Sequence, residues 1–191
     1  MNRMKNKWSL LWNPFTRIAG WQALGIGLIV MALTGVIGKC GALAFDGVLD
    51  AHLVSVLSFQ NAFLLLAIDW LSLVVVMAIT GFVIARDVRF VDIAGTMTLA
   101  RAPFLLMALF SLGVSMPDAS TLKANPAVLL AHPTVIIFSV LSIPVLVWFV
   151  ALMYNGLKVS TGGKGAKLIT GFMVGLIIAE ILSKTLIHFF L

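Results

Sequence analysis

The chain has 191 residues, of which 61% are hydrophobic and only 10% are charged, and its mean hydropathy is +1.12. Soluble domains carry roughly 25% charged residues, so this composition excludes an ordinary water-soluble protein. The net charge of +6 is explained by membrane topology and anionic lipid, and we expect no nucleic-acid partner. The single cysteine, Cys40, excludes an intramolecular disulfide.

The apolar runs are long and continuous, which is typical of membrane-spanning helices and not of the short alternating strands of a barrel. We therefore predict an all-α integral membrane protein, a bundle of five transmembrane helices with short interfacial amphipathic helices. One membrane domain covers residues 18–191. Its predicted spans, in chain order, are 18–38, 62–85, 95–115, 133–154 and 168–191.

Residues 1–17 form a basic segment before the first span. They contain Arg3, Lys5 and Lys7 and no acid, with Trp8 and Trp12 among the apolar positions. Basic residues interleaved with tryptophan are typical of a helix lying in the membrane interface. We expect such a helix on the cytoplasmic side, broken at Asn13-Pro14.

Two connections between spans also carry recognisable patterns. In residues 45–59, Phe45, Val48 and Leu49 begin an apolar repeat at helical spacing, with Asp46 and Asp50 to one side. This pattern predicts an amphipathic helix on the outer membrane surface. Residues 116–133 are rich in proline, serine and asparagine, which indicates a loop.

The distribution of lysine and arginine orients the chain. Ten of the 13 basic residues fall in the N-terminal segment and in the second and fourth connections, whereas Lys39 and Lys123 lie in the other two. The positive-inside rule then places the N-terminus in the cytoplasm and the C-terminus outside. The first expected partner is the lipid bilayer.

The longest polar interruption is the stretch 86–103. We predict that Arg86, Arg89, Asp92 and Arg101 form a cytoplasmic loop surface. Pro103 would lie in the first turns of the third span, where a missing N–H is tolerated. Arg101 would extend back to the inner headgroups.

Ionisable residues within predicted spans are costly and are therefore functional candidates. They are Asp69, Glu180 and Lys184, with His188 near the outer end of the last span. Asp69 and Lys184 each lie about seven residues from an outer end. This predicts an ion pair between them, with Arg101 approaching the deeper Glu180 from the cytoplasmic side.

Two interpretations of this polar network follow. One is a proton or ion relay. The other is a fully paired network that sets helix register, and this structural interpretation is the one we favour because structural pairs also perturb pKa values. A bundle that used the network for transport would need Glu180 to titrate as its partner changes.

Two further patterns occur in the sequence. His52, His132 and His188 all fall on the predicted outer side, but their spacing matches no metal motif, and we expect neither a metal nor another cofactor. Gly171-x-x-x-Gly175 in the last span permits close helix packing, either within the chain or in a dimer. No catalytic arrangement of residues is visible, so we do not expect an enzyme.

Three segments together resemble bacterial members of the Yip (Ypt-interacting protein) family of membrane domains. They are Asn13-Pro14-Phe15, then Val91-Asp92-Ile93-Ala94-Gly95 leading to Ala100-Arg101-Ala102-Pro103, and residues 148–157 before the glycine and lysine loop. The resemblance implies a five-helix domain with a cytoplasmic N-terminus. Eukaryotic relatives bind prenylated small GTPases through a longer N-terminal region whose motif this chain lacks, so that function is not carried over.

Composition, topology and resemblance lead to one expected function and one alternative. The expected function is that of a non-enzymatic inner-membrane scaffold, adaptor or lipid-associated protein, with a membrane-protein partner or a second copy of the chain. The alternative is a small transporter or ion conductor that uses Asp69, Glu180 and Lys184.

Overall fold

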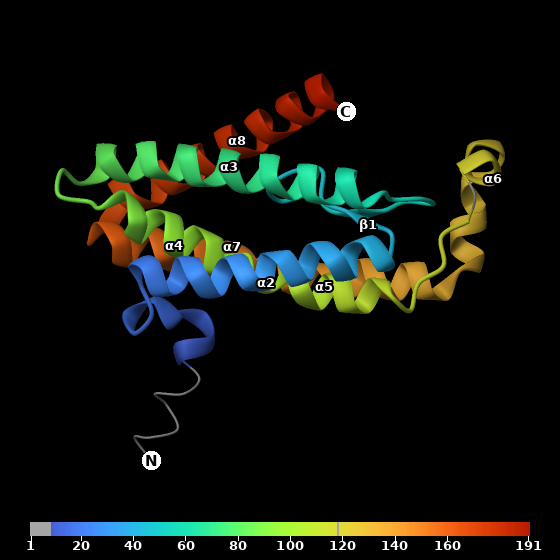
Figure 1. Cartoon of the computed structure of the whole chain (residues 1–191), viewed down its shortest axis with the longest axis horizontal. Coiled ribbons are helices and arrows are strands. Elements are labelled where there is room, and N and C mark those ends of the chain that lie inside the picture. Colours follow the sequence, from blue (N-terminus) through green and yellow to red (C-terminus); the bar gives the residue numbers. More distant parts are fainter. Residues whose placement is uncertain (1–8, 118) are drawn as a thin grey trace, which may run out of the picture.

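The computed structural model describes residues 9–117 and 119–191 and consists almost entirely of helices (Figure 1). Within this part of the chain, five helices are long and apolar enough to cross a membrane. They are α2 (Gly20–Cys40), α3 (Phe59–Ile84), the pair α4 (Phe90–Ala100) and α5 (Phe104–Ser111), α7 (Pro133–Thr161) and α8 (Gly165–Phe190). The predicted number and order of long apolar helices are therefore confirmed.

Two spans differ from the predicted bounds by five residues or more at one end. The third begins at Phe90 instead of residue 95, because part of the polar stretch is already helical. The fourth continues to Thr161, seven residues past the predicted end, and stops where Gly162 adopts a left-handed conformation with φ of 62°. Glycine tolerates that conformation and is the usual residue just after a helix. Apolar runs locate spans, but they do not show where a helix continues into a polar segment.

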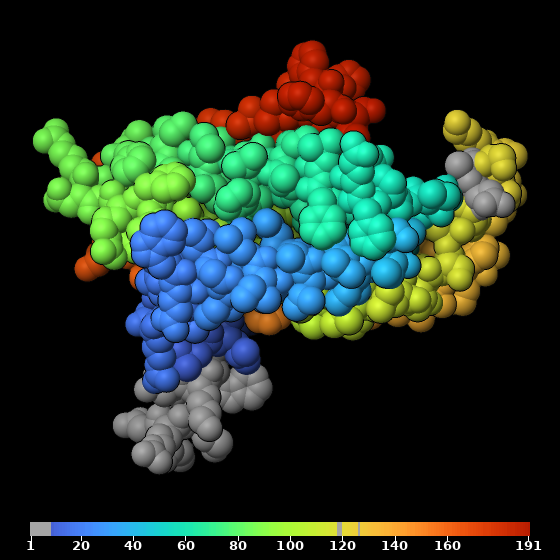
Figure 2. All heavy atoms as spheres, in the orientation of Figure 1, coloured from blue at the N-terminus to red at the C-terminus, as the bar shows by residue number. Residues whose placement is uncertain are grey.

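The helix pair α4–α5 lies at the centre of the bundle and contacts α2, α3 and α7. Its approach to α2 is unusually close, since a Cβ at Gly27 would lie 2.7 Å from the backbone nitrogen of Leu99. A Cβ at Gly95 would likewise overlap the carbonyl oxygen of Gly20. Small residues allow helix backbones to approach in this way. Figure 2 shows α2 and α3 side by side on one face of the molecule.

The third span is interrupted at its middle. From Arg101 to Leu106 the backbone bonds run from each N–H to the carbonyl three residues earlier. Pro103 explains this tighter turn, because it has no N–H and its ring clashes with the carbonyl four residues back. Pro103 thus lies well inside the span, and the prediction that it occupies the first turns was wrong.

The connection 41–58 is not the predicted surface helix. It contains two short antiparallel strands, β1 (Leu43–Ala44) and β2 (His52–Leu53). Between them, Phe45 and Val48 are buried in the bundle core. The apolar residues at helical spacing therefore pack inward from an irregular segment. Helical spacing alone cannot distinguish a helix from a loop whose apolar side chains all enter the core.

The other peripheral segments are short. The region 116–133 contains α6 (Ala119–Ala124) and η2 (Pro126–Ala131), which Figure 1 shows beyond one end of the bundle. At the N-terminus, residues 9–12 are helical and η1 (Pro14–Thr16) follows the predicted break at Asn13. The Trp148 indole donates to the Leu11 carbonyl (2.8 Å). The predicted interfacial residues Arg3, Lys5, Lys7 and Trp8 lie outside the described residues.

Candidate functional site

Helix α8 holds the connection 41–58 by its polar side chains. The backbone N–H of Leu49 donates to Glu180 Oε2 (2.8 Å), and that of Val48 donates to Ser183 Oγ (3.2 Å). Val48 is 0% exposed. A buried irregular segment has backbone groups that no helix satisfies, so these acceptors remove a cost of about 1–3 kcal/mol per group.

Charged side chains close the same connection. Lys184 Nζ donates to Asp50 Oδ2 (2.8 Å) and lies 3.3 Å from Glu180 Oε1. Across the strand pair, His52 Nδ1 lies 3.0 Å from Asp46 Oδ1. We call Asp46, Asp50, His52, Glu180, Ser183 and Lys184 the loop clamp. Each of its three carboxyl groups has a lysine or histidine nitrogen within 3.3 Å.

The Asp46–His52 pair lies outside the helices and changes both pKa values. Hydrogen bonding to Asp46 raises the pKa of His52 above its ordinary value of 6.5, against the opposing effect of partial burial. Burial alone would raise the pKa of Asp46. The hydrogen bond and the charge of His52 outweigh that effect and lower the pKa below its ordinary value of 3.8.

The predicted Asp69–Lys184 ion pair is wrong. Lys184 binds Asp50, whereas Asp69 faces Arg101, with Asp69 Oδ2 3.7 Å from Arg101 Nη2. Equal depth in two spans does not by itself bring two side chains into contact. The connection 41–58 supplies Asp50 as a nearer partner for Lys184. Arg101 is 3% exposed and does not extend to the headgroups, so that prediction is also wrong.

The local structure explains how Arg101 reaches Asp69. Arg101 follows α4 directly and lies at the tight turn before Pro103, about 16 Å along a span that begins at Phe90. The neighbouring Trp70 donates its indole N–H to Thr98 Oγ1 (2.8 Å), which ties α3 to α4 beside the pair. We call Asp69 and Arg101 the buried pair.

The buried pair has no hydrogen bonds within the described residues. Both oxygens of Asp69 and all three guanidinium nitrogens of Arg101 are buried without a hydrogen-bond partner there, and so is Ser72 Oγ, one turn after Asp69. The guanidinium carbon lies 5.2 Å from the Phe104 ring centroid and 5.9 Å from that of Phe149. Aromatic faces attract a cation at such distances, but they do not replace hydrogen bonds.

The loop clamp and the buried pair are neighbours. The charges of Glu180, Asp46 and Asp50 act on Asp69, and that of Glu180 also acts on Arg101. Among the described residues no direct ion pair joins Glu180 to Arg101, so the approach predicted for them is limited to this longer-range effect. A change of charge in one cluster would therefore change the electrostatic energy of the other.

The predicted cytoplasmic loop surface is divided by the fold. Arg86 is exposed, and Arg89 donates two hydrogen bonds to Asp92 in the first turn of α4 (2.8 and 3.0 Å). Arg101 lies more than two turns further along the span and does not share their surface. The true connection between α3 and α4 is only 85–89.

The three histidines do not form a site. His52 pairs with Asp46, His132 precedes α7, and the His188 ring contacts Phe189 with centroids 6.3 Å apart. The described residues contain no group of three or more side chains that could hold a metal ion.

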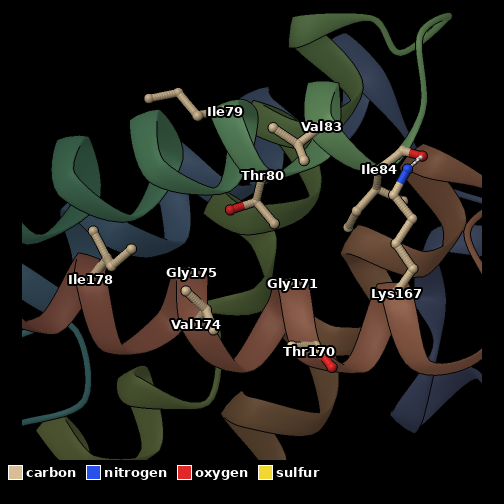
Figure 3. A pocket seen from close by; sticks show the side chains of 10 residues that line it. All are labelled: Ile79, Thr80, Val83, Ile84, Lys167, Thr170, Gly171, Val174, Gly175 and Ile178. Carbon is tan, nitrogen blue, oxygen red and sulfur yellow. Dashed lines mark hydrogen bonds between the residues drawn. The ribbon is translucent and has the colours of Figure 1, made fainter.

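The glycines of α8 lie against α3. A Cβ at Gly175 would lie 2.6 Å from Thr80 Oγ1, and one at Gly171 would lie 3.2 Å from Ile84 Cδ1. Beside this contact runs a groove of about 280 Å³ between the two helices (Figure 3). Lys167 closes one end of the groove by donating to the Ile84 carbonyl (2.9 Å).

Sequence reasoning missed several of these residues. Ser183 and Lys167 are polar residues of an apolar helix, and their spacing from other α8 residues could have identified them. Ser183 lies between Glu180 and Lys184, while Lys167, Gly171 and Gly175 recur every four residues and so share one face of α8. The role of Asp50 had no such signal, because it depends on where an irregular connection folds.

Comparison with known proteins adds no relative to this description. No protein-family model matches the chain. No curated protein matches it, and no solved structure does. The resemblance to the Yip family therefore remains a prediction from the sequence.

Proposed function

We propose that the chain is a five-span integral protein of a bacterial inner membrane, Yip-like in type, that acts as a non-enzymatic scaffold, adaptor or lipid-associated protein. Five long apolar helices support membrane insertion. The concentration of basic residues at the end of the bundle where α2, α4 and α8 begin supports a cytoplasmic position for that end. We call it the basic end.

The observation that carries this proposal is the use of α8 polar groups in the loop clamp. Glu180 accepts a backbone hydrogen bond from Leu49 and pairs with Lys184, which also binds Asp50. A transport cycle through Glu180 would have to break these bonds and leave a backbone N–H without an acceptor. The clamp is instead suited to holding an irregular segment inside the bundle.

The lateral surface also supports association. Only 28% of the apolar stretch of α2, of α7 and of α8 is buried within the chain, compared with 61% for α3. Large side chains such as Trp21, Ile137 and Ile181 are exposed on these helices. In a membrane such faces meet lipid or the helices of another protein.

The test compares ion flux with folding. We expect proteoliposomes with the wild-type protein or Glu180→Gln to show the leak of empty vesicles, and the variant to unfold at a slightly lower temperature. Native mass spectrometry after extraction with surrounding lipid should retain a stoichiometric protein partner, a second copy or a defined lipid. Flux that Glu180→Gln removes without loss of fold would refute the scaffold proposal.

The proposed topology has its own test. Cys40 ends α2 and is exposed, so it should react with a membrane-impermeant thiol reagent in intact cells. Protection until lysis would place the basic end outside and overturn the orientation.

A second candidate function, proton or ion transfer, is favoured by the buried pair alone. Two charged side chains without hydrogen bonds are costly at this depth, and such residues often mark ion pathways. Flux that is lost in Asp69→Asn would support this candidate. The matched control is Asp87→Asn, at an exposed acid in the short connection 85–89, and it should leave flux unchanged.

A further inference from the structure

The groove between α3 and α8 has apolar walls and an open side. Ile79 and Val83 of α3 line it together with Val174 and Ile178 of α8, and Gly171 and Gly175 also line it (Figure 3). Val83, Val174 and Ile178 are each at least half exposed, so in a membrane this groove opens toward lipid. An apolar chain is the kind of ligand that such walls accommodate.

The basic end of this groove carries positive charge. Lys167 lies across it, held by one hydrogen bond to the Ile84 carbonyl, and an ammonium group has three donors. Lys164 is exposed at the start of α8, and Arg86 is exposed two residues after Ile84. The acid in the adjoining connection is Asp87. The net charge at the groove end is therefore positive and complements an anionic headgroup.

A second copy of the chain fits this face less well. The glycines at 171 and 175 already allow α3 to approach α8, as shown by the 2.6 Å from a Gly175 Cβ to Thr80 Oγ1. A partner helix would also meet the Lys167 ammonium, which is costly to bury without an acidic partner. A lipid fits this face better, because its acyl chain can occupy the apolar groove and its phosphate can pair with the Lys167 ammonium.

We propose that the α3–α8 groove binds one anionic phospholipid, with an acyl chain along Val83 and Val174 and its phosphate on Lys167. The inference rests on the proposed membrane insertion and deepens the lipid association by naming its site and lipid class. A lysine near anionic headgroups contributes about 1 kcal/mol, so Lys167 should give about a fivefold preference for the anionic lipid.

Native mass spectrometry can test this with the full chain and defined mixtures of phosphatidylglycerol and phosphatidylcholine. The wild-type protein should retain one phosphatidylglycerol in preference to phosphatidylcholine. Lys167→Met should lower that preference about fivefold, and Val174→Phe, which fills the groove, should remove the retained lipid with either headgroup. The outer lysine Lys123 provides a charge control, since Lys123→Met should leave the preference unchanged.

A second groove provides the steric control. It lies between α2 and α3, has a similar volume of about 290 Å³, and none of its lining residues is charged. Ala32→Phe, which fills it, should not affect the preference. Equal retention of both lipids by the wild type, or no effect of Val174→Phe, would overturn the proposal, as would a retained second copy in place of lipid.

The outcomes separate this inference from the proposed function. A protein that conducts ions but keeps its Lys167-dependent lipid would refute the scaffold and leave the groove assignment standing. A protein that stays dispersed without detergent and carries no lipid would refute both.

Discussion

The loop clamp and the buried pair use the same kinds of side chain and differ in what those side chains contact. In the loop clamp, Glu180 and Ser183 accept backbone N–H groups and Lys184 joins two acids. In the buried pair, Asp69 and Arg101 lie 3.7 Å apart and make no hydrogen bond within the described residues. Among the charged side chains, the pair without hydrogen bonds is the more deeply buried, since Lys184 is 48% exposed and Asp69 is not exposed at all.

This difference teaches that a charge within a span is not by itself a sign of function. The loop clamp has an evident structural purpose, because an irregular segment inside a bundle needs acceptors for its amides. The buried pair has no comparable purpose in the fold. Substitutions that shorten these side chains can measure how much each cluster contributes to the free energy of unfolding.

The largest effect is expected at the buried pair. Arg101→Met removes one partner and leaves the Asp69 carboxyl buried without one, which should lower the free energy of unfolding by about 3–5 kcal/mol. The double variant Asp69→Leu with Arg101→Met should recover most of that loss, because apolar replacement of both partners is often neutral. Thermal unfolding in one detergent measures both. If the double variant is as unstable as the single one, apolar side chains cannot replace the pair, and the prediction is wrong.

A smaller effect is expected at the centre of the loop clamp. Glu180→Ala leaves the Leu49 N–H without its acceptor and should cost about 1–3 kcal/mol. Glu180→Gln keeps an amide oxygen at that position and should cost less. Hydrogen exchange at the Leu49 amide should accelerate in Glu180→Ala. An unchanged exchange rate would mean that the connection is held in place by its apolar contacts alone.

Ser183 should contribute less than Glu180. Ser183→Ala leaves the buried Val48 N–H without its acceptor, and because the lost hydrogen bond is neutral, we expect the lower end of the range of about 1–3 kcal/mol. Thr185 provides a control two residues away, because its hydroxyl is exposed and bonds only within α8. Thr185→Ala should change stability by less than about 0.5 kcal/mol. Equal losses of stability in Ser183→Ala and Thr185→Ala would show that the hydrogen bond from Val48 to Ser183 does not stabilise the connection 41–58.

The smallest effect is a pH dependence from Asp46 and His52. A raised histidine pKa stabilises the fold below the ordinary value of 6.5 and loses this contribution as the pH rises through the raised pKa. A lowered aspartate pKa stabilises the fold above 3.8 and loses it as the pH falls through the lowered pKa. The pair therefore contributes most between about pH 4 and 6.5, by less than about 1 kcal/mol because it is partly exposed.

Unfolding temperatures at pH 6 and pH 9 measure the loss of stability as the pH rises through the raised pKa of His52. The wild type should lose a little stability between them, and His52→Gln should lack that step. Asp50 and Lys184 also act on His52, and both are still present in His52→Gln, so a step that they produced would remain in the variant. An identical step in the variant would assign it to another group.

The span pattern could be read from the sequence because it depends on local composition. Runs such as residues 62–85 are too apolar for water, and their length matches a bilayer. The site could not be read to the same extent. Residues on one helix, such as Glu180 and Lys184, were placed correctly on a shared face, because helical periodicity sets that geometry. Partners on different helices, such as Asp69 and Arg101, were assigned wrongly.

By itself, then, the sequence determined five apolar helices, their order, the basic end and the break at Asn13-Pro14, all of which follow from composition and short-range geometry. Only the tertiary structure decided that residues 45–51 enter the bundle and that Arg101 meets Asp69 near mid-span. The physical reason is that burial of Phe45 and Val48 depends on space between helices far apart in the chain. The tight turn at Pro103 follows Arg101, whose side chain is buried beside Asp69.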